Sequence, residues 1–81
     1  LEAALDRNMD GVMTALREEF PSWKEEDYLL YCFTAAGFSS TTVSTLLRKE
    51  KNVVYNRLYR LKGKISDSGS RRKQFFLDAL H

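Results

Sequence analysis

The chain has 81 residues, of which 43% are hydrophobic and 30% are charged, and its formal net charge is +2. This length allows one small domain, and the single cysteine, Cys32, excludes an internal disulfide, which favours a reducing, cytoplasmic setting. The longest nearly uninterrupted apolar run, residues 28–38, covers 11 residues, whereas a membrane span needs roughly 20. We therefore expect this fragment to make no membrane contact.

The charges are unevenly distributed along the chain. Residues 1–27 hold eight acids and three bases, whereas residues 28–81 hold ten bases and three acids, so the two parts carry −5 and +7. A strongly cationic part of a small protein attracts polyanions from a distance. Ordinary solvated helix faces are the alternative explanation, but the asymmetry favours a nucleic-acid partner.

Residues 1–20 are predicted to form one amphipathic helix. Its apolar residues recur at steps close to three or four: Leu1, Leu5, Met9, Val12, Met13, Leu16 and Phe20. The helix must end before Pro21, whose ring and missing N–H stop a helix. We interpret residues 1–20 as a linker helix that leads from an upstream region into a domain over residues 21–81.

Two shorter helices are predicted next. Ser22 can cap the second helix, with Glu25 reaching back in a capping box. Gly37 can end this helix in a left-handed conformation, and Phe38 can pack back onto its last turn. The hydroxyl run 39–42 then caps a short third helix.

A basic helix is predicted over about 52–65, after a polar turn. Either Asn52 or Glu50 can cap it, and the sequence does not choose between them. One face of this helix can be buried, because four apolar residues recur at helical spacing: Val54, Leu58, Leu61 and Ile65. A last helix is predicted over 71–80. The elements together predict an all-α fold, a bundle of about five helices that contains a helix-turn-helix.

From Trp23 to Ile65 the sequence resembles the LuxR/GerE-type helix-turn-helix family. The segments that carry the resemblance align without a gap: Trp23-Lys-Glu-Glu-Asp27, Ala35-Ala-Gly-Phe-Ser39, Val43, Leu47, Val54 and Leu58 through Ile65. The resemblance implies that the chain is the C-terminal DNA-binding module of a multidomain transcriptional regulator of the Bacteroidetes type. In such regulators a sensory or repeat domain, and often a membrane anchor, lies upstream. Glu50 replaces the family's Ser cap, and Gly63 interrupts the helix at a cost of roughly 1 kcal/mol relative to Ala.

The resemblance also implies which side chains meet DNA. The base-reading positions of the family fall on Tyr55, Asn56 and Tyr59. Asn can bond bidentately to adenine, and Tyr can contact a thymine methyl group or donate to a base or phosphate, although Tyr59 could equally pack against the domain. Phosphate contacts are expected from Lys49, Lys51, Arg60, Lys62 and Lys64. Arg57 is at least as well explained by an ion pair with an acid such as Asp27.

The last predicted helix carries more apolar surface than the core of a small bundle requires. In LuxR-type proteins the helix after the reader commonly forms the dimer contact, so the resemblance implies a homodimer through residues 71–80. Alternatively, the first helix folds back over this surface and the chain is a monomer.

Sequence-specific binding to double-stranded DNA, with the 52–65 helix in the major groove, is the predicted function. Two alternatives stay open, a helical protein-interaction module that has lost DNA contact and the promoter-reading region of a sigma factor. Enzyme activity is not expected, because the sequence has one His, at its end, and no Gly-rich phosphate loop. No cofactor is expected, and no metal site, since His, Cys and Asp do not occur at ligand spacing.

Overall fold

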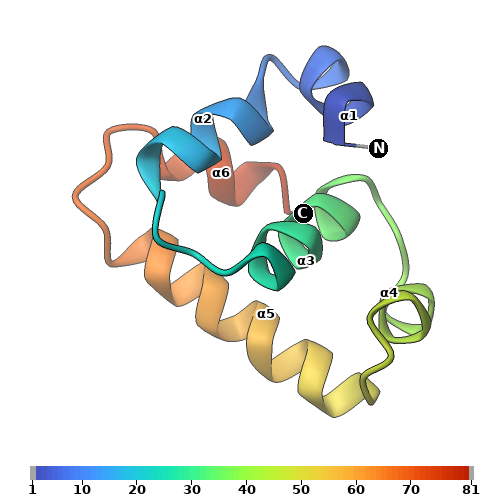
Figure 1. Ribbon diagram of the computed structural model, residues 1–81. Coiled ribbons are helices and arrows are strands. Elements are labelled where there is room, and N and C mark those ends of the chain that lie inside the picture. The colour runs from blue at the N-terminus through green and yellow to red at the C-terminus, as the bar shows by residue number, and fades with distance from the viewer. Residues whose placement is uncertain (1, 81) are drawn as a thin grey trace.

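The computed structural model describes residues 2–80 and is helical throughout its regular elements (Figure 1). Within these residues the chain forms six helices: α1 (Glu2–Asn8), α2 (Val12–Glu19), α3 (Glu25–Ala35), α4 (Ser40–Leu47), α5 (Lys51–Ser66) and α6 (Lys73–Asp78). The predicted all-α class is confirmed. One helix more than expected is present because the first predicted helix is divided in two.

The division lies at Asp10 and Gly11, between α1 and α2. Both residues have positive φ, 55° and 74°, which is a left-handed conformation that cannot continue a right-handed helix. The single helix predicted over residues 1–20 is therefore wrong in this respect. Leu1, which the prediction included, lies outside the described residues.

Asp6 caps the start of α2 from the preceding helix. Its carboxylate accepts hydrogen bonds from the backbone N–H of Met13 at 2.6 Å and of Thr14 at 3.0 Å, and a further one from the Thr14 hydroxyl. The hydrogen bond from the Thr14 hydroxyl is the main reason why the pKa of Asp6 lies below its ordinary value of 3.8. The carboxylate thus supplies the cap that Gly11, at the N-cap position, cannot.

Replacing Asp6 with alanine is expected to lower the free energy of unfolding by about 1 kcal/mol at neutral pH. Because folding lowers the pKa of Asp6, its contribution is present above the pKa of the unfolded chain and is lost as the pH falls through the lower folded value. The free energies of unfolding of the unaltered chain and of Asp6→Ala, measured by urea titration, should therefore become equal at acidic pH. Asp6→Asn, which keeps an acceptor oxygen, should retain part of the stability. A difference between Asp6→Ala and the unaltered chain that stays constant down to strongly acidic pH would contradict this role.

α3 begins at Glu25, with Lys24 at the N-cap position and no side-chain cap. The capping box predicted from Ser22 and Glu25 is wrong, because the Glu25 carboxylate instead receives two hydrogen bonds of 2.9 Å from the guanidinium of Arg17. These bonds hold the pKa of Glu25 below its ordinary value. The same guanidinium donates to Glu2 at 2.7 Å. One arginine of α2 thus joins α1, α2 and α3.

The connection from α3 to α4 follows the prediction. Gly37 has a φ of 90°, and the N–H of Phe38 donates to the carbonyl of Phe33 at 3.1 Å, which closes the last turn of α3. The Phe38 ring stacks on the Phe33 ring, with centroids 5.5 Å apart. The Ser39 hydroxyl accepts from the N–H of Thr42 at 3.2 Å, so the hydroxyl cap of α4 is confirmed.

Residues 48–50 connect α4 to α5. Arg48 ends α4 with a φ of 55°, and the N–H of Lys49 donates to the carbonyl of Ser44 at 3.0 Å. Glu50 holds the N-cap position of α5 without a side-chain hydrogen bond, so Asn52 lies inside the helix. The turn is therefore closed by backbone hydrogen bonds rather than by a side-chain cap.

A single hydrophobic core receives side chains from all six helices within residues 2–80. Its largest fully buried side chains are Tyr31, Phe76, Met13, Leu16, Leu30, Leu61 and Ile65. The hydroxyl of Tyr31 donates to the carbonyl of Phe76 at 2.8 Å, which satisfies a buried donor and a buried acceptor. Residues of α1 and α2 belong to this core, and their connection to an upstream region stays a prediction.

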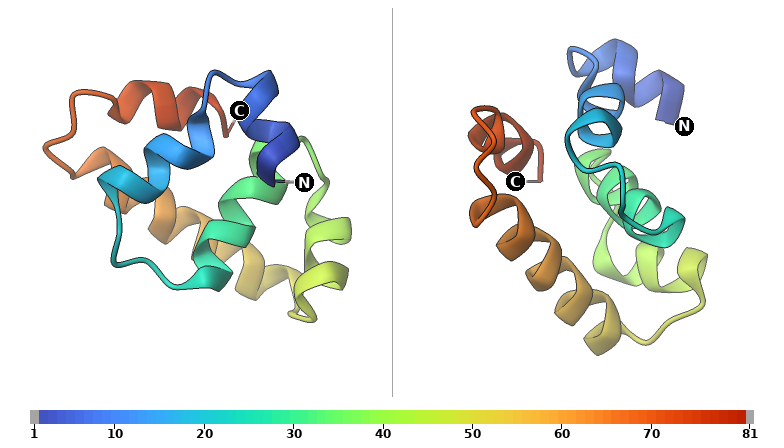
Figure 2. Two further views of the ribbon diagram at one scale, coloured as in Figure 1. Left: turned by 45° about the horizontal axis from the view of Figure 1, so that its top comes forward. Right: turned by 60° about the vertical axis from the view of Figure 1, so that its left-hand side comes forward.

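α5 lies along one side of the molecule, and α6 returns beside its far end (Figure 2). α5 contacts α3, α4 and α6. α6 is shorter than the helix predicted over 71–80, since its helical turns begin at Lys73 and end at Asp78. Among residues 2–80, no helix combines the length and the apolar character that crossing a membrane requires.

Candidate nucleic-acid interface

α5 has one buried face and one exposed face. Val54, Leu61 and Ile65 are at most 3% exposed and pack into the core. On the opposite side, Tyr55 is 56% exposed and Tyr59 is 80% exposed. The division predicted from the apolar spacing is therefore confirmed for these residues, whereas Leu58, the fourth apolar residue of the predicted face, is half-buried and packs against the core.

The three predicted base-reading residues share one stripe of the exposed face. Tyr55, Asn56 and Tyr59 are all exposed, and Tyr59 follows Tyr55 by four positions and Asn56 by three, which places it on the same side of the helix as both. The exposure of Tyr59 excludes half-buried packing against the domain. Asn52 is also exposed, one turn before Asn56, and the sequence prediction missed it. The spacing of four between two asparagines was the signal that could have found it.

The five predicted phosphate-contacting cations lie around this stripe. Lys49 precedes α5 in the turn and is exposed. Arg60 and Lys64, one helical turn apart, lie on one side of the stripe, and Lys51 and Lys62 lie on the other. Arg60 and Lys51 are exposed, Lys62 is half-buried, and the Lys64 side chain is 53% exposed. The cations thus border the stripe on both sides.

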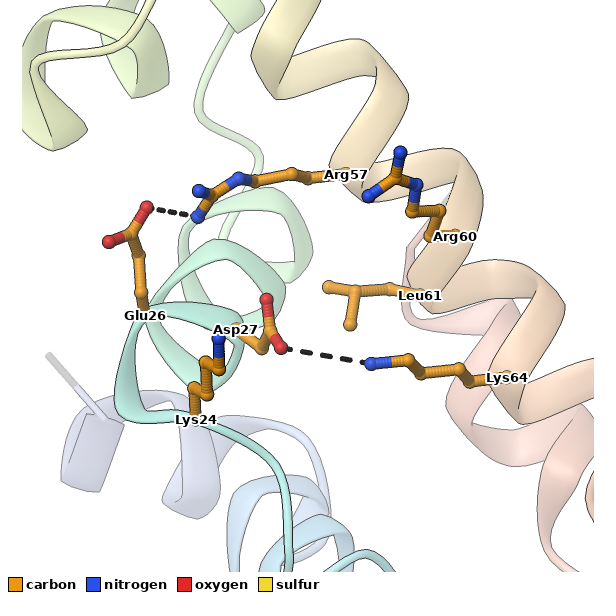
Figure 3. Close-up of a pocket in the computed structure, with 7 residues that line it drawn as sticks. All are labelled: Lys24, Glu26, Asp27, Arg57, Arg60, Leu61 and Lys64. Carbon is orange, nitrogen blue, oxygen red and sulfur yellow. Dashed lines mark hydrogen bonds and ion pairs between the residues drawn. The ribbon is translucent and has the colours of Figure 1, made fainter.

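A hollow separates the start of α3 from the middle of α5 (Figure 3). It is lined by Lys24, Glu26 and Asp27 on the α3 side and by Arg57, Arg60, Leu61 and Lys64 on the α5 side. Arg57 pairs with Glu26, and the Lys64 ammonium lies 3.9 Å from the Asp27 carboxylate. The expected ion pair of Arg57 is therefore present, with Glu26 in place of Asp27. These pairs connect α5 to α3 at the surface, beside the core contacts between the two helices.

Two cations at this hollow have no ion-pair partner among residues 2–80. Arg60 lines the hollow from α5, and Lys24 lines it from the N-cap position of α3. Lys24 was not among the predicted contacts, because only the folded chain brings it beside the basic helix. Both cations are exposed and can attract an anion that reaches the edge of α5.

The outer surface of α5 and its preceding turn is strongly cationic. Positions 48–64 hold seven Lys or Arg and one acid, Glu50. Arg57 and Lys64 pair with acids of α3, so five of the seven cations carry charge that no intramolecular carboxylate neutralises within residues 2–80. The arrangement can hold a polyanion along α5 while amide and hydroxyl groups face it.

Cys32, the one nucleophilic thiol, is a core residue. It is 3% exposed, and burial raises the pKa of its thiol, whereas activation of a cysteine requires a lowered pKa. Within residues 2–80, no group of three or more His, Cys, Asp or Glu side chains is placed to hold a metal ion. The exposed face of α5 is therefore the site with the clearest chemical character.

Comparisons with known proteins assign no family to the chain. No protein-family model, no curated protein and no solved structure matches it.

Proposed function

We propose that the chain binds double-stranded DNA in a sequence-specific manner, with α5 in the major groove, as the output module of a LuxR/GerE-like transcriptional regulator. The observation that carries this proposal is the face of α5 on which Tyr55, Asn56 and Tyr59 are exposed, opposite a fully apolar buried face. Groups that can read base edges are thus available to a partner, while the core holds the helix in place.

The dimensions of α5 suit a major groove. Its 16 residues give a length of about 24 Å at 1.5 Å per residue. The groove is about 12 Å wide and admits one helix. α4 precedes α5 and contacts it, joined through residues 48–50 in the order that a helix-turn-helix requires (Figure 1). Because α5 lies at the side of the molecule, its exposed face is open to a groove (Figure 2).

Each side chain of the interface has a distinct proposed role. Asn56 bonds to adenine, and the two tyrosines contact thymine methyl groups or donate to phosphate oxygens. The cations Lys49, Lys51, Arg60, Lys62 and Lys64 neutralise phosphates along the groove edges. Lys64 must exchange its 3.9 Å contact with Asp27 for a phosphate. The Lys64 side chain is 53% exposed and therefore accessible to DNA, whereas the Asp27 side chain is 18% exposed.

A homodimer through residues 71–80 would have to use the apolar atoms of α6 that remain accessible. Phe76 and Leu80 are buried within the chain, whereas Phe75 and Leu77 are half-buried and keep part of their surface. Dimerisation would therefore leave the fold of each chain unchanged and pair only the outer side of α6.

A helical protein-interaction module is the second candidate. Tyr59, Tyr55 and Leu46 are 80%, 56% and 51% exposed, and tyrosine is enriched in protein interfaces. The charge of the surface favours DNA over a protein partner, because the aromatic residues lie among cations rather than within an apolar patch.

The proposal predicts DNA binding that weakens steeply as salt rises. Duplexes selected by the chain from a randomised pool would be titrated at several salt concentrations, and log K should fall with log salt by about 0.9 per neutralised phosphate. Arg60→Ala should reduce this slope by about 0.9. Arg7→Ala removes an exposed cation of α1 and should leave the slope unchanged. Binding without salt dependence, or no enrichment of any duplex, would contradict the proposal.

A further inference from the structure

α5 contains a glycine that the packing of the chain does not require. A Cβ atom at Gly63 would meet no other atom within 4 Å, and the φ of Gly63 is not in the left-handed region. Glycine inside a helix is less favourable than alanine, because its backbone loses more freedom on folding. Neither crowding nor backbone conformation within the fold accounts for it.

Gly63 lies on the same stripe as the proposed base-reading residues. It follows Tyr59 by four positions and Asn56 by seven, which returns it to the same side of α5. A surface hollow opens beside it where α6 passes the end of α5. The lining residues of this hollow are Tyr59, Lys62, Gly63, Ser66, Asp67 and Leu77. The absence of a side chain at Gly63 therefore leaves space at the outer surface of α5.

We infer that Gly63 is the position at which a sugar–phosphate strand of DNA passes closest to α5, an inference that rests on the proposed function. Lys62 supplies a cation for a phosphate, and the hydroxyls of Tyr59 and Ser66 can donate to its oxygens. Leu77 offers an apolar wall to a deoxyribose. A side chain at position 63 would hold the strand away from these groups.

The lining of the hollow holds one cation and one acid, and the excess of positive charge comes from neighbouring residues of α5. Lys62 lines the hollow directly, and Arg60 and Lys64 lie on the other edge of the stripe. Asp67 is the one acid in the lining, and it lies at the C-cap, beyond the last residue of α5. A phosphate near Lys62 would be repelled by this carboxylate, so removing the charge of Asp67 should strengthen binding.

Gly63→Ala gives two effects of opposite sign under this inference. The melting temperature of the chain should rise by roughly 4 to 8 °C, because alanine favours the helix and no intramolecular contact opposes its methyl group. Affinity for the selected duplex should fall roughly tenfold, as expected when a methyl group is forced into a close contact. Gly69→Ala is the control for DNA affinity, since Gly69 is an exposed loop glycine whose added Cβ would also meet nothing within 4 Å.

The outcomes separate this inference from the proposed function. Loss of affinity for Gly63→Ala, with Gly69→Ala unchanged and Asp67→Asn tighter, would support it. Unchanged DNA affinity of Gly63→Ala, a lower melting temperature, or weaker binding of Asp67→Asn would overturn it while DNA binding by the chain stands. If the unaltered chain selects no duplex, the proposed function itself fails. The presence of a glycine at position 63 would then have to be explained by the close approach of a protein partner.

Discussion

Replacing Phe76 with alanine is expected to lower the free energy of unfolding by about 3 to 5 kcal/mol, the range for deleting a buried aromatic side chain. Phe76 is fully buried, and its ring meets the ring of Phe20 edge-on with centroids 5.7 Å apart. α6 has only six residues, so it depends on this anchor rather than on its own helical propensity. A domain of 81 residues has a total stability of roughly 4 to 12 kcal/mol, so the loss would unfold much of the population.

Phe75→Ala provides the matched comparison for Phe76→Ala. Phe75 is the neighbouring residue of the same type, but it is only half-buried, so its removal should have a clearly smaller effect. Phe76→Leu keeps most of the buried volume and should remain folded enough to measure. Urea denaturation followed by circular dichroism would give the three values. Equal losses for Phe75→Ala and Phe76→Ala would contradict the assignment of Phe76 as the anchor of α6.

Asn56→Ala is expected to weaken binding to the selected duplex by about 1 to 3 kcal/mol and to relax the base preference at one position. The side chain of Asn56 is exposed on the outer stripe of α5, so its removal leaves the core untouched. The loss should therefore appear in DNA affinity and not in thermal stability. Fluorescence anisotropy with the selected duplex and with single-base variants would measure both the affinity and the preference.

Arg60→Ala serves as the reference for Asn56→Ala. Arg60 is proposed to contact a phosphate, which is present in every sequence, so its loss should weaken binding to all duplexes by a similar factor. Asn56→Ala should instead discriminate between duplexes less well than the unaltered chain. Losses for Asn56→Ala that are the same for every duplex would remove Asn56 from the base-reading residues.

Local signals predicted the elements between α3 and α4 correctly. The positive φ of Gly37, the packing of Phe38 and the cap from Ser39 each depend on residues within five positions, so the sequence alone contains their causes. The same holds for the buried face of α5, because apolar spacing determines which side of a helix enters a core.

Contacts between distant residues account for the elements that the sequence did not predict. The break after α1 depends on the carboxylate of Asp6, seven residues before the N–H of Met13 that it caps. The capping box at Ser22 does not form because Arg17 of another helix binds the Glu25 carboxylate. In α2, a residue of the preceding helix thus supplies the cap that is missing locally. In α3, a residue of another helix takes the carboxylate that the local cap would have used.

The candidate site shows the same limit of local reasoning. Exposure of Tyr55 and Asn56 follows from the helical spacing, and the sequence predicted it. The entry of Lys24 into the hollow beside α5 and the choice of Glu26 as partner of Arg57 depend on how α3 crosses α5. Such pairings require three-dimensional placement, which spacing along one helix does not contain.

A nuclear magnetic resonance titration of the isotope-labelled chain with the selected duplex would test most directly whether α5 meets DNA. The largest chemical-shift changes should occur at the side-chain amide of Asn56, the backbone from Asn52 to Gly63 and the turn at Lys49. Resonances of α1 and of α3 near Leu29, which is exposed and lines a hollow with Glu2 of α1 and Arg17 of α2, should move little. Changes centred on Leu29, with α5 unaffected, would contradict DNA binding through α5.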